Sequence, residues 1–212
     1  MAPPWDPGWG IEMHRRILIP VLLAVVVILL GAGGFLLFYP QASPARTVVS
    51  GLAPGGPFRL TDQNGATVSD ADLKGRPFAI FFGFTRCPEI CPTTLWEMSQ
   101  ALQALGPDAD RLKVLFVTVD PERDRPEMLQ QYLQSFDSRI IGLTGSEADI
   151  TAVAKAYRVY WRKVPTSDGD YTMDHSAMIY LMDAEGRFTD TIAYGTPGPE
   201  RVAALRRLLA GA

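Results

Sequence analysis

The sequence predicts an α/β protein with a mixed β-sheet flanked by helices, preceded by one N-terminal transmembrane helix. Three observations lead to this prediction: a long uncharged apolar run near the N-terminus, apolar runs that alternate with segments of helical period, and two closely spaced strands near the C-terminus. Of the 212 residues, 47% are hydrophobic and 20% are charged, which is enough for a substantial core. The net charge of −3 argues against nucleic acid as a partner, because phosphate binding needs a basic face.

The apolar run covers residues 17–38 and contains no charge. As a helix it is long enough to cross a hydrocarbon core about 30 Å thick. Arg15 and Arg16 precede it, and no Lys or Arg follows until Arg46, so the positive-inside rule places the N-terminus in the cytoplasm. A cleaved signal peptide is the alternative, but its apolar region is normally shorter. We therefore expect a cytoplasmic tail at 1–16, an anchor at 17–38, a Pro-, Ala-, Gly- and Ser-rich tether at 39–57 and a globular domain at 58–212.

The globular part is predicted element by element. An almost continuously apolar run at 78–84 indicates a strand buried on both faces, and further apolar runs indicate a second buried strand at 112–119 and a short strand at 140–143. Turn sequences rich in Asp, Asn and Gly indicate two hairpins, with strands at 58–61 and 67–68 and at 177–182 and 188–193. Apolar residues at the helical period predict helices over 92–105, 127–136, 146–157 and 199–209. Residues 158–174 show no regular pattern, so we expect an irregular segment there.

The order of these elements limits the possible sheet architectures. Alternation of strands and helices in the first half implies right-handed crossovers and a parallel pair, and the last hairpin adds antiparallel strands. A mixed sheet with helices on both faces and a cysteine pair directly after a buried strand is the thioredoxin-like arrangement.

The two cysteines of the chain are Cys87 and Cys91, four residues apart after the strand at 78–84. On a first helical turn this spacing places their Cβ atoms about 5–6 Å apart on one face. Either a disulfide or a shared metal ion fits that distance. The N–H groups of a helix N-terminus favour the thiolate and lower the thiol pKa. Three interpretations remain open at this point: a structural disulfide, thiol–disulfide chemistry and metal binding.

His175 is the only histidine after the apolar run, and it lies just before the strand at 177–182. In a thioredoxin-like fold the loop before that strand faces the start of the cysteine-bearing helix. Two thiolates and an imidazole form a soft ligand set that selects Cu(I) or zinc over magnesium and calcium. Met173 is a candidate thioether ligand, although packing is the favoured interpretation. Asp174 either orients the His175 ring through its second nitrogen or points to solvent.

Asp120 closes the strand at 112–119, at the sheet edge where the cysteines are expected. One interpretation makes it part of a loop that faces a partner next to the metal, or an acid that supports the metal ligands from behind. The other makes it part of a strand-to-helix turn with solvated charges.

Three stretches of the sequence resemble the Sco/SenC family of copper chaperones. They are FFGFTRCPEICPTTL at 81–95, VTVDPERDRPEML at 117–129 and GDYTMDHSAMIYLMD at 169–183. The resemblance implies a thioredoxin-like fold and binding of Cu(I) or Cu(II) by Cys87, Cys91 and His175. It also implies a role in assembling cytochrome c oxidase, chiefly at the binuclear copper site of subunit II, with another copper chaperone as a candidate donor. The expected location is a bacterial inner membrane with the domain in the periplasm, or equivalently the mitochondrial inner membrane facing the intermembrane space.

Two functions are compatible with these residues. A metallochaperone binds and hands over copper and turns over no substrate. A thiol–disulfide oxidoreductase would reduce the cysteines of the oxidase subunit before metal loading, with Cys87 and Cys91 as its redox-active disulfide. Both functions need the cysteines, and only the first needs His175. The three-residue spacer differs from the C-x-x-C of ordinary oxidoreductases, which favours copper.

Overall fold

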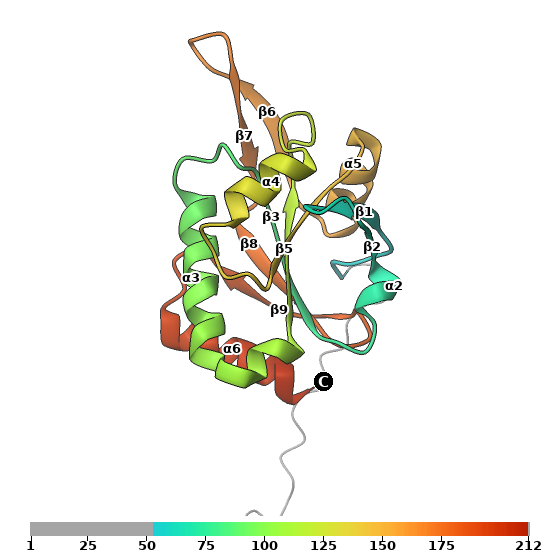
Figure 1. Ribbon diagram of the computed structural model, residues 1–212, viewed down its shortest axis with the longest axis vertical. Helices are drawn as coiled ribbons and strands as arrows, with labels where there is room; N and C mark the ends of the chain where they lie inside the picture. The colour runs from blue at the N-terminus through green and yellow to red at the C-terminus, as the bar shows by residue number, and fades with distance from the viewer. Residues whose placement is uncertain (1–52, 212) are drawn as a thin grey trace, which may run out of the picture. The chain divides into compact units, whose positions relative to one another are not determined.

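The computed structural model describes residues 53–211 (Figure 1). The expected cytoplasmic tail, the anchor at 17–38 and most of the tether lie outside the described residues. Within residues 53–211, no helix is both long and apolar enough to span a membrane.

A seven-stranded mixed sheet forms the centre of the domain, with the strand order β2-β1-β5-β4-β3-β8-β9. The three central strands β3, β4 and β5 run parallel, and the outer pairings are antiparallel. The sequence predicts one parallel pair of strands, and the sheet contains two, β3–β4 and β4–β5. The strands are β1 (Arg59–Asp62), β2 (Thr67–Ser69), β3 (Phe78–Gly83), β4 (Lys113–Thr118), β5 (Ile140–Thr144), β8 (Met178–Met182) and β9 (Phe188–Ala193).

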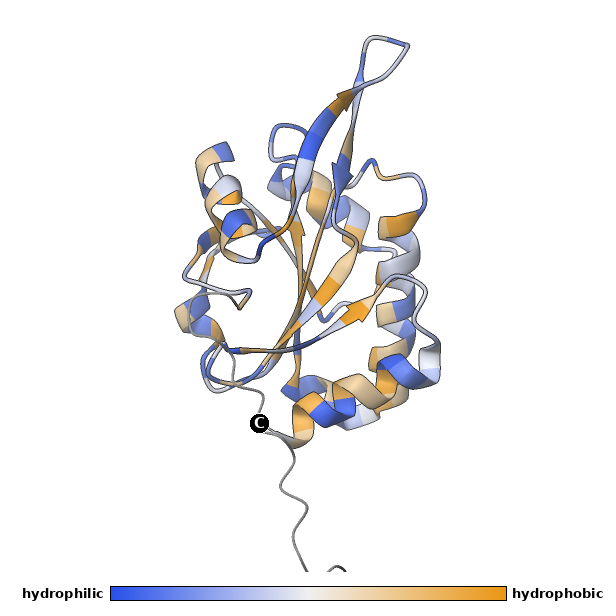
Figure 2. Cartoon of the chain, turned by 180° about the vertical axis from the view of Figure 1, so that it is seen from behind, coloured by the Kyte–Doolittle hydropathy of each residue, from blue (hydrophilic) through white to orange (hydrophobic). Residues whose placement is uncertain are grey.

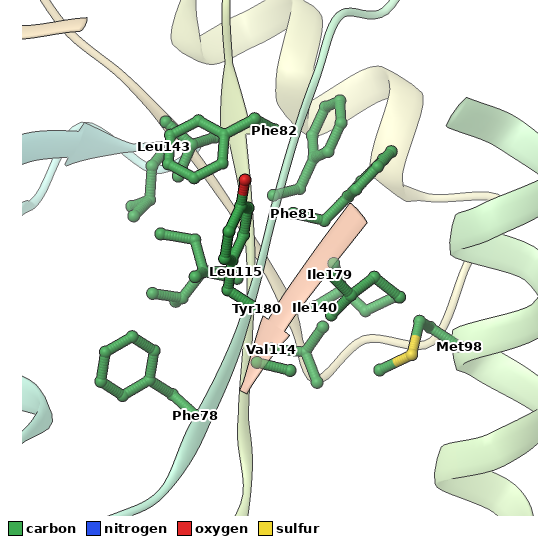
Figure 3. Packing of buried hydrophobic residues seen from close by; sticks show 14 of the residues in the cluster. Phe78, Phe81, Phe82, Met98, Val114, Leu115, Ile140, Leu143, Ile179 and Tyr180 are labelled. Carbon is green, nitrogen blue, oxygen red and sulfur yellow. The ribbon is translucent and has the colours of Figure 1, made fainter. Parts of the chain in front are cut away.

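Helices cover both faces of this sheet. On one face Phe116 lies 5.8 Å, ring to ring, from Tyr132 of α4, and on the other face Phe82 lies 5.5 Å from Tyr157 at the end of α5. Figure 3 shows the two sides of the core, with Phe81 and Met98 on one and Phe82 on the other. The helices are α2 (Asp70–Leu73), α3 (Ile90–Leu105), the 3-10 helix η1 (Gly106–Arg111), α4 (Pro126–Leu133), α5 (Glu147–Ala156) and α6 (Gly198–Ala210).

Local sequence explains where the main elements begin. All six residues of β3 are buried, as expected for an apolar run between two neighbouring strands and two helical layers. Ser146 caps α5, because the Asp149 N–H donates to its hydroxyl at 3.2 Å. Pro126 occupies the first turn of α4, where its missing N–H costs little. In Figure 2 the central strands are hydrophobic, whereas the helices alternate between hydrophobic and hydrophilic residues.

The segment expected to be irregular is instead a β-hairpin. Strands β6 (Trp161–Pro165) and β7 (Tyr171–His175) form a separate two-stranded sheet in which Trp161 pairs with His175. The hairpin extends beyond the end of the central sheet (Figure 1). Its strands pair with each other and not with the main sheet, so they carry no continuous apolar run for sequence analysis to detect. His175 is therefore the last residue of a strand and not part of a loop.

Candidate metal centre

The end of β3 and the start of α3 place the two cysteines. Cys91 is the second residue of α3 and is completely buried, and Cys87 lies in the preceding loop with 9% of its surface exposed. Both are free thiols. The backbone N–H of Cys91 donates to the Cys87 sulfur over 3.3 Å, so this sulfur accepts one of the free donors at the helix start. The expected arrangement of both sulfurs at the first turn of the helix is therefore present.

Gly83, the last residue of β3, provides the space for the Cys91 sulfur. A Cβ atom at this position would lie 2.8 Å from the Cys91 sulfur and 2.7 Å from the Phe116 ring. Both distances are too short for carbon contacts, so any side chain larger than hydrogen would displace the sulfur or the ring. Sequence analysis did not identify this residue as part of the site.

His175 approaches the sulfurs from the end of β7. Its Nε2 atom lies 3.6 Å from the Cys91 sulfur, and the three potential ligand atoms of Cys87, Cys91 and His175 all lie within 4.8 Å of one another. Its Nδ1 atom lies 3.0 Å from the Ser176 carbonyl oxygen. Because a carbonyl only accepts, Nδ1 carries the hydrogen in the neutral ring, and the lone pair of Nε2 faces the sulfurs.

Aromatic side chains enclose the imidazole. The His175 ring lies 5.8 Å from the Phe84 ring and 6.3 Å from the Phe81 ring, in edge-to-face arrangements. Within residues 53–211, no other group of three or more His, Cys, Asp or Glu side chains comes close enough to share a metal ion.

Hydrogen bonding between the two cysteines gives their thiols different acidities. The Cys91 thiol donates to the Cys87 sulfur and, helped by backbone N–H groups, lowers the pKa of Cys87 to about 4 against the opposing effect of burial. The same hydrogen bond, together with burial, raises the pKa of Cys91 far above its usual value. In the reduced pair the thiolate form is therefore favoured on Cys87 and the thiol form on Cys91.

The donor set suits a soft metal ion. Two sulfurs and one imidazole nitrogen converge on one point, one sulfur is already a thiolate, and no carboxylate belongs to the cluster. Thiolate and imidazole ligands of this kind select Cu(I) or zinc over magnesium and calcium. The three residues present thus fit copper, the metal that the family resemblance implies.

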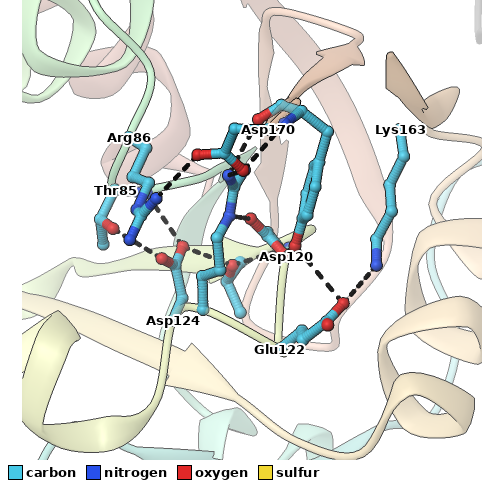
Figure 4. Close-up of polar contacts among 10 residues, drawn as sticks. Thr85, Arg86, Asp120, Glu122, Asp124, Lys163 and Asp170 are labelled. Atoms are coloured by element: carbon cyan, nitrogen blue, oxygen red, sulfur yellow. Dashed lines mark hydrogen bonds and ion pairs between the residues drawn. The ribbon is translucent and has the colours of Figure 1, made fainter. Parts of the chain in front are cut away.

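Asp124 holds the cysteine loop in place. Its side chain is fully buried and accepts three hydrogen bonds, from the Thr85 N–H at 2.9 Å, the Thr85 hydroxyl at 2.6 Å and the Thr118 hydroxyl at 2.7 Å (Figure 4). These contacts tie the loop after β3 to the loop after β4. Burial raises the pKa of the Asp124 carboxyl, and the hydrogen bonds oppose this shift. Sequence analysis chose Asp120 from the same segment and missed Asp124.

Asp120 is also buried, but its contacts lead to the hairpin and not to the metal ligands. It accepts a hydrogen bond from the Tyr171 hydroxyl at 2.8 Å and pairs with Arg123. The Asp120 carboxylate is therefore not solvated, and the contacts described for it are with Arg123 and Tyr171.

Asp174 and Met173, which precede His175, contact other parts of the protein. The Asp174 carboxylate is half-exposed and pairs with Arg162 at 3.4 Å, and the Ser176 carbonyl occupies the position at Nδ1 that was considered for Asp174. Asp174 thus follows the solvent-facing alternative. Met173 is 7% exposed and belongs to the hydrophobic core, in agreement with the packing interpretation.

Fold and site together define a thioredoxin-like domain that presents two cysteines and one histidine to a metal ion. The family model described as SCO1/SenC matches residues 46–210, and the chain belongs to this family. The SCO2-like protein of Rickettsia felis is 36% identical over 176 residues, which cover 79% of this chain and 86% of that protein.

Solved structures agree with this assignment. The structure of Bradyrhizobium japonicum ScoI with copper bound is 54% identical in sequence, with a TM-score of 0.70 over 74% of this chain and 99% of that chain. The structure of BsSco, described as a member of the Sco family of cytochrome c oxidase assembly proteins with a disulfide switch, is 26% identical. Its TM-score is 0.60 over 75% of this chain and 95% of that chain.

Proposed function

We propose that this protein is a copper metallochaperone that binds copper through Cys87, Cys91 and His175. The observation that carries the proposal is the convergence of two sulfurs and one imidazole nitrogen within 4.8 Å. The copper-bound structure of the Bradyrhizobium japonicum relative supports the identity of the metal. Copper is the cargo of the protein and not a catalytic cofactor.

The residues have separate tasks in this function. Cys87 offers a thiolate before copper arrives, Cys91 gives up its proton on binding, and Nε2 of His175 supplies the third donor with its tautomer fixed by Ser176. Cys87 is the more exposed of the two cysteines, so it is the sulfur that an incoming or outgoing copper ion meets first.

The proposed recipient is the binuclear copper site of cytochrome c oxidase subunit II, with another copper chaperone as donor. Description of the BsSco relative as a cytochrome c oxidase assembly protein supports this assignment. The proposed location is the outer face of a bacterial inner membrane, with residues 17–38 as a single-pass anchor and residues 1–16 in the cytoplasm. The charge asymmetry of the sequence around the apolar run supports this orientation.

A second candidate function is reduction of the disulfide in subunit II before metal loading. The low pKa of Cys87 beside a protonated Cys91 favours it. The Cys87 thiolate would attack the target disulfide and form a mixed disulfide, and the released sulfur would take a proton. Cys91 would then displace the second target thiol, which leaves the target as a dithiol and this protein with a Cys87–Cys91 disulfide.

One paired experiment separates the two functions. Copper affinity and the rate of disulfide reduction are measured on wild type and on His175→Ala. A chaperone predicts a loss of copper affinity of about 10- to 100-fold or more, since even residues behind metal ligands contribute that much, and a nearly unchanged reduction rate. Asp174→Asn is the matched control, because this neighbouring residue does not contact the imidazole. Unchanged affinity with a lost reduction rate would refute the chaperone and promote the reductase.

A further inference from the structure

The hairpin that carries His175 has no backbone pairing with the central sheet. Strands β6 and β7 form their own two-stranded sheet, and β7 continues directly into β8 after His175. A two-stranded hairpin is marginally stable alone, so side-chain contacts must hold it: Met173 packs in the core at the middle of β7, and further contacts hold the far end. The position of His175 relative to the sulfurs therefore depends on what holds the opposite end of β7, which begins at Tyr171.

Arg123, in the loop after β4, holds that end. Its Nη1 donates to the Tyr171 carbonyl oxygen at 2.8 Å and lies 3.2 Å from the Asp170 carboxylate, and its Nε pairs with the buried Asp120. The guanidinium carbon lies 3.7 Å from the centre of the Tyr171 ring. The Arg123 side chain is only 12% exposed, so these charge-assisted contacts are largely shielded from water.

Tyr171 reinforces the same contact from the hairpin. Its hydroxyl donates to Asp120 at 2.8 Å, and its ring lies between Arg123 and Lys163, whose ammonium nitrogen is 4.6 Å from the ring centre. Side chains alternate along a strand, so Tyr171 and His175 lie on the same face of β7, about 13 Å apart. Fixing Tyr171 against Arg123 thus sets the direction in which His175 points.

The cysteine half of the site is held by the adjacent residue of the same loop. Asp124 binds Thr85 in the cysteine loop, and Arg123 binds Tyr171 in the hairpin. Asp170 adds a direct link, because it also pairs at 3.2 Å with Arg86, the neighbour of Cys87 (Figure 4). We propose that the loop 120–124 sets the spacing between the two halves of the metal centre, and that Arg123 is the positioning residue for His175. This inference rests on the proposed copper-binding function.

Loss of Arg123 affects only one half of the centre under this proposal. The Cys87–Cys91 pair keeps its support from Asp124, while the hairpin loses the contacts that orient His175. The effect on copper binding should therefore pass entirely through the imidazole.

A double-mutant cycle on the full-length protein tests this prediction. Cu(I) affinity is measured for wild type, Arg123→Gln, His175→Ala and the double variant. We expect Arg123→Gln to weaken binding about 10-fold or more in the wild-type background and less than about 2-fold in the His175→Ala background. The control is Arg187→Gln, since Arg187 also pairs with two carboxylates, Asp183 and Glu185, but at an exposed position in the turn between β8 and β9. An equal loss in both backgrounds would overturn the proposal.

A measurement on the metal-free protein tests the positioning role of Arg123 separately from the proposed copper ligands. Hydrogen exchange of the metal-free Arg123→Gln variant should be faster in β6 and β7 and unchanged in β3 and α3. If His175→Ala alone leaves copper affinity unchanged, the proposed ligand set fails, and the exchange pattern still decides whether Arg123 holds the hairpin. Uniformly faster exchange, or no change in the hairpin, would overturn the positioning role.

A milder variant covers the case in which Arg123→Gln does not fold. Tyr171→Phe keeps the ring beside the two cations and removes only the contacts of the hydroxyl, with Asp120 at 2.8 Å and with Glu122 at 3.4 Å. Its copper affinity should fall by a smaller factor than expected for Arg123→Gln, and only when His175 is present. A loss that persists in the His175→Ala background would contradict the proposal.

Discussion

Replacement of Gly83 by alanine tests how closely the end of β3 defines the metal centre. The added methyl group would lie 2.8 Å from the Cys91 sulfur, about 0.6 Å inside the shortest ordinary contact, and 2.7 Å from the Phe116 ring. The strand is paired with β4 at this position and cannot move aside easily. Overpacking of this kind costs about 1–3 kcal/mol of stability. Displacement of one sulfur by about half an ångström also spoils the ligand geometry, so we expect copper affinity to fall about 10-fold or more.

The assay compares thermal unfolding of the metal-free protein with Cu(I) affinity measured by competition with a chromogenic chelator. Gly142→Ala is the matched control, because its methyl group would lie 2.6 Å from Leu133, in the core and away from the sulfurs. Both variants should lose stability, at about 2–4 °C in melting temperature per kcal/mol. Only Gly83→Ala should lose copper affinity. Equal affinities of the two variants would refute the argument that Gly83 makes room for the sulfur.

Further predictions concern the pH dependence, the cysteine loop and the orientation in the membrane. The pKa of Cys87 is lowered to about 4 in the folded protein, whereas an unfolded thiol titrates near 8.5. Between these values the folded reduced protein binds fewer protons than the unfolded chain, so its free energy of unfolding should rise from pH 5 to 8. Denaturant titrations should show this slope in wild type and not in Cys87→Ser or the oxidised protein. Asp124→Ala leaves one buried and two part-buried donors without this acceptor and should cost about 3 kcal/mol, whereas Asp124→Asn should cost less; equal losses would contradict this. Reporter enzymes fused after residue 46 should be active only outside the cytoplasm, and cytoplasmic activity would reverse the proposed orientation.

Much of the fold could be predicted because its signals are local. The buried strands β3 and β4 are predominantly apolar runs, and the capping of α5 by Ser146 follows from two residues three positions apart. The hairpin β6–β7 was missed for the opposite reason. Strand β6 contains Arg162, Lys163 and Pro165 and is largely exposed, and the two strands pair only with each other, so neither period nor hydrophobicity marks them.

The candidate site likewise contains residues that the sequence predicts and residues that it does not. Cys87, Cys91 and His175 could be identified from residue type, spacing and family resemblance, and the structure brings these three side chains together. The residues that hold them could not be identified, because their contacts join positions far apart in the chain. Asp124 meets Thr85 across 39 positions and Arg123 meets Tyr171 across 48. Such contacts depend on how the loops at the sheet edge come together, which a single sequence does not specify.

The central claim is that Cys87, Cys91 and His175 together bind one copper ion. X-ray absorption spectroscopy of the copper-loaded reduced protein tests it most directly, because sulfur and imidazole scatterers around copper give distinct signals. We predict two sulfur ligands and one imidazole ligand in wild type, loss of the imidazole signal in His175→Ala, and loss of one sulfur in Cys87→Ser or Cys91→Ser. A wild-type spectrum with fewer than two sulfurs, or an imidazole signal that survives in His175→Ala, would contradict the account.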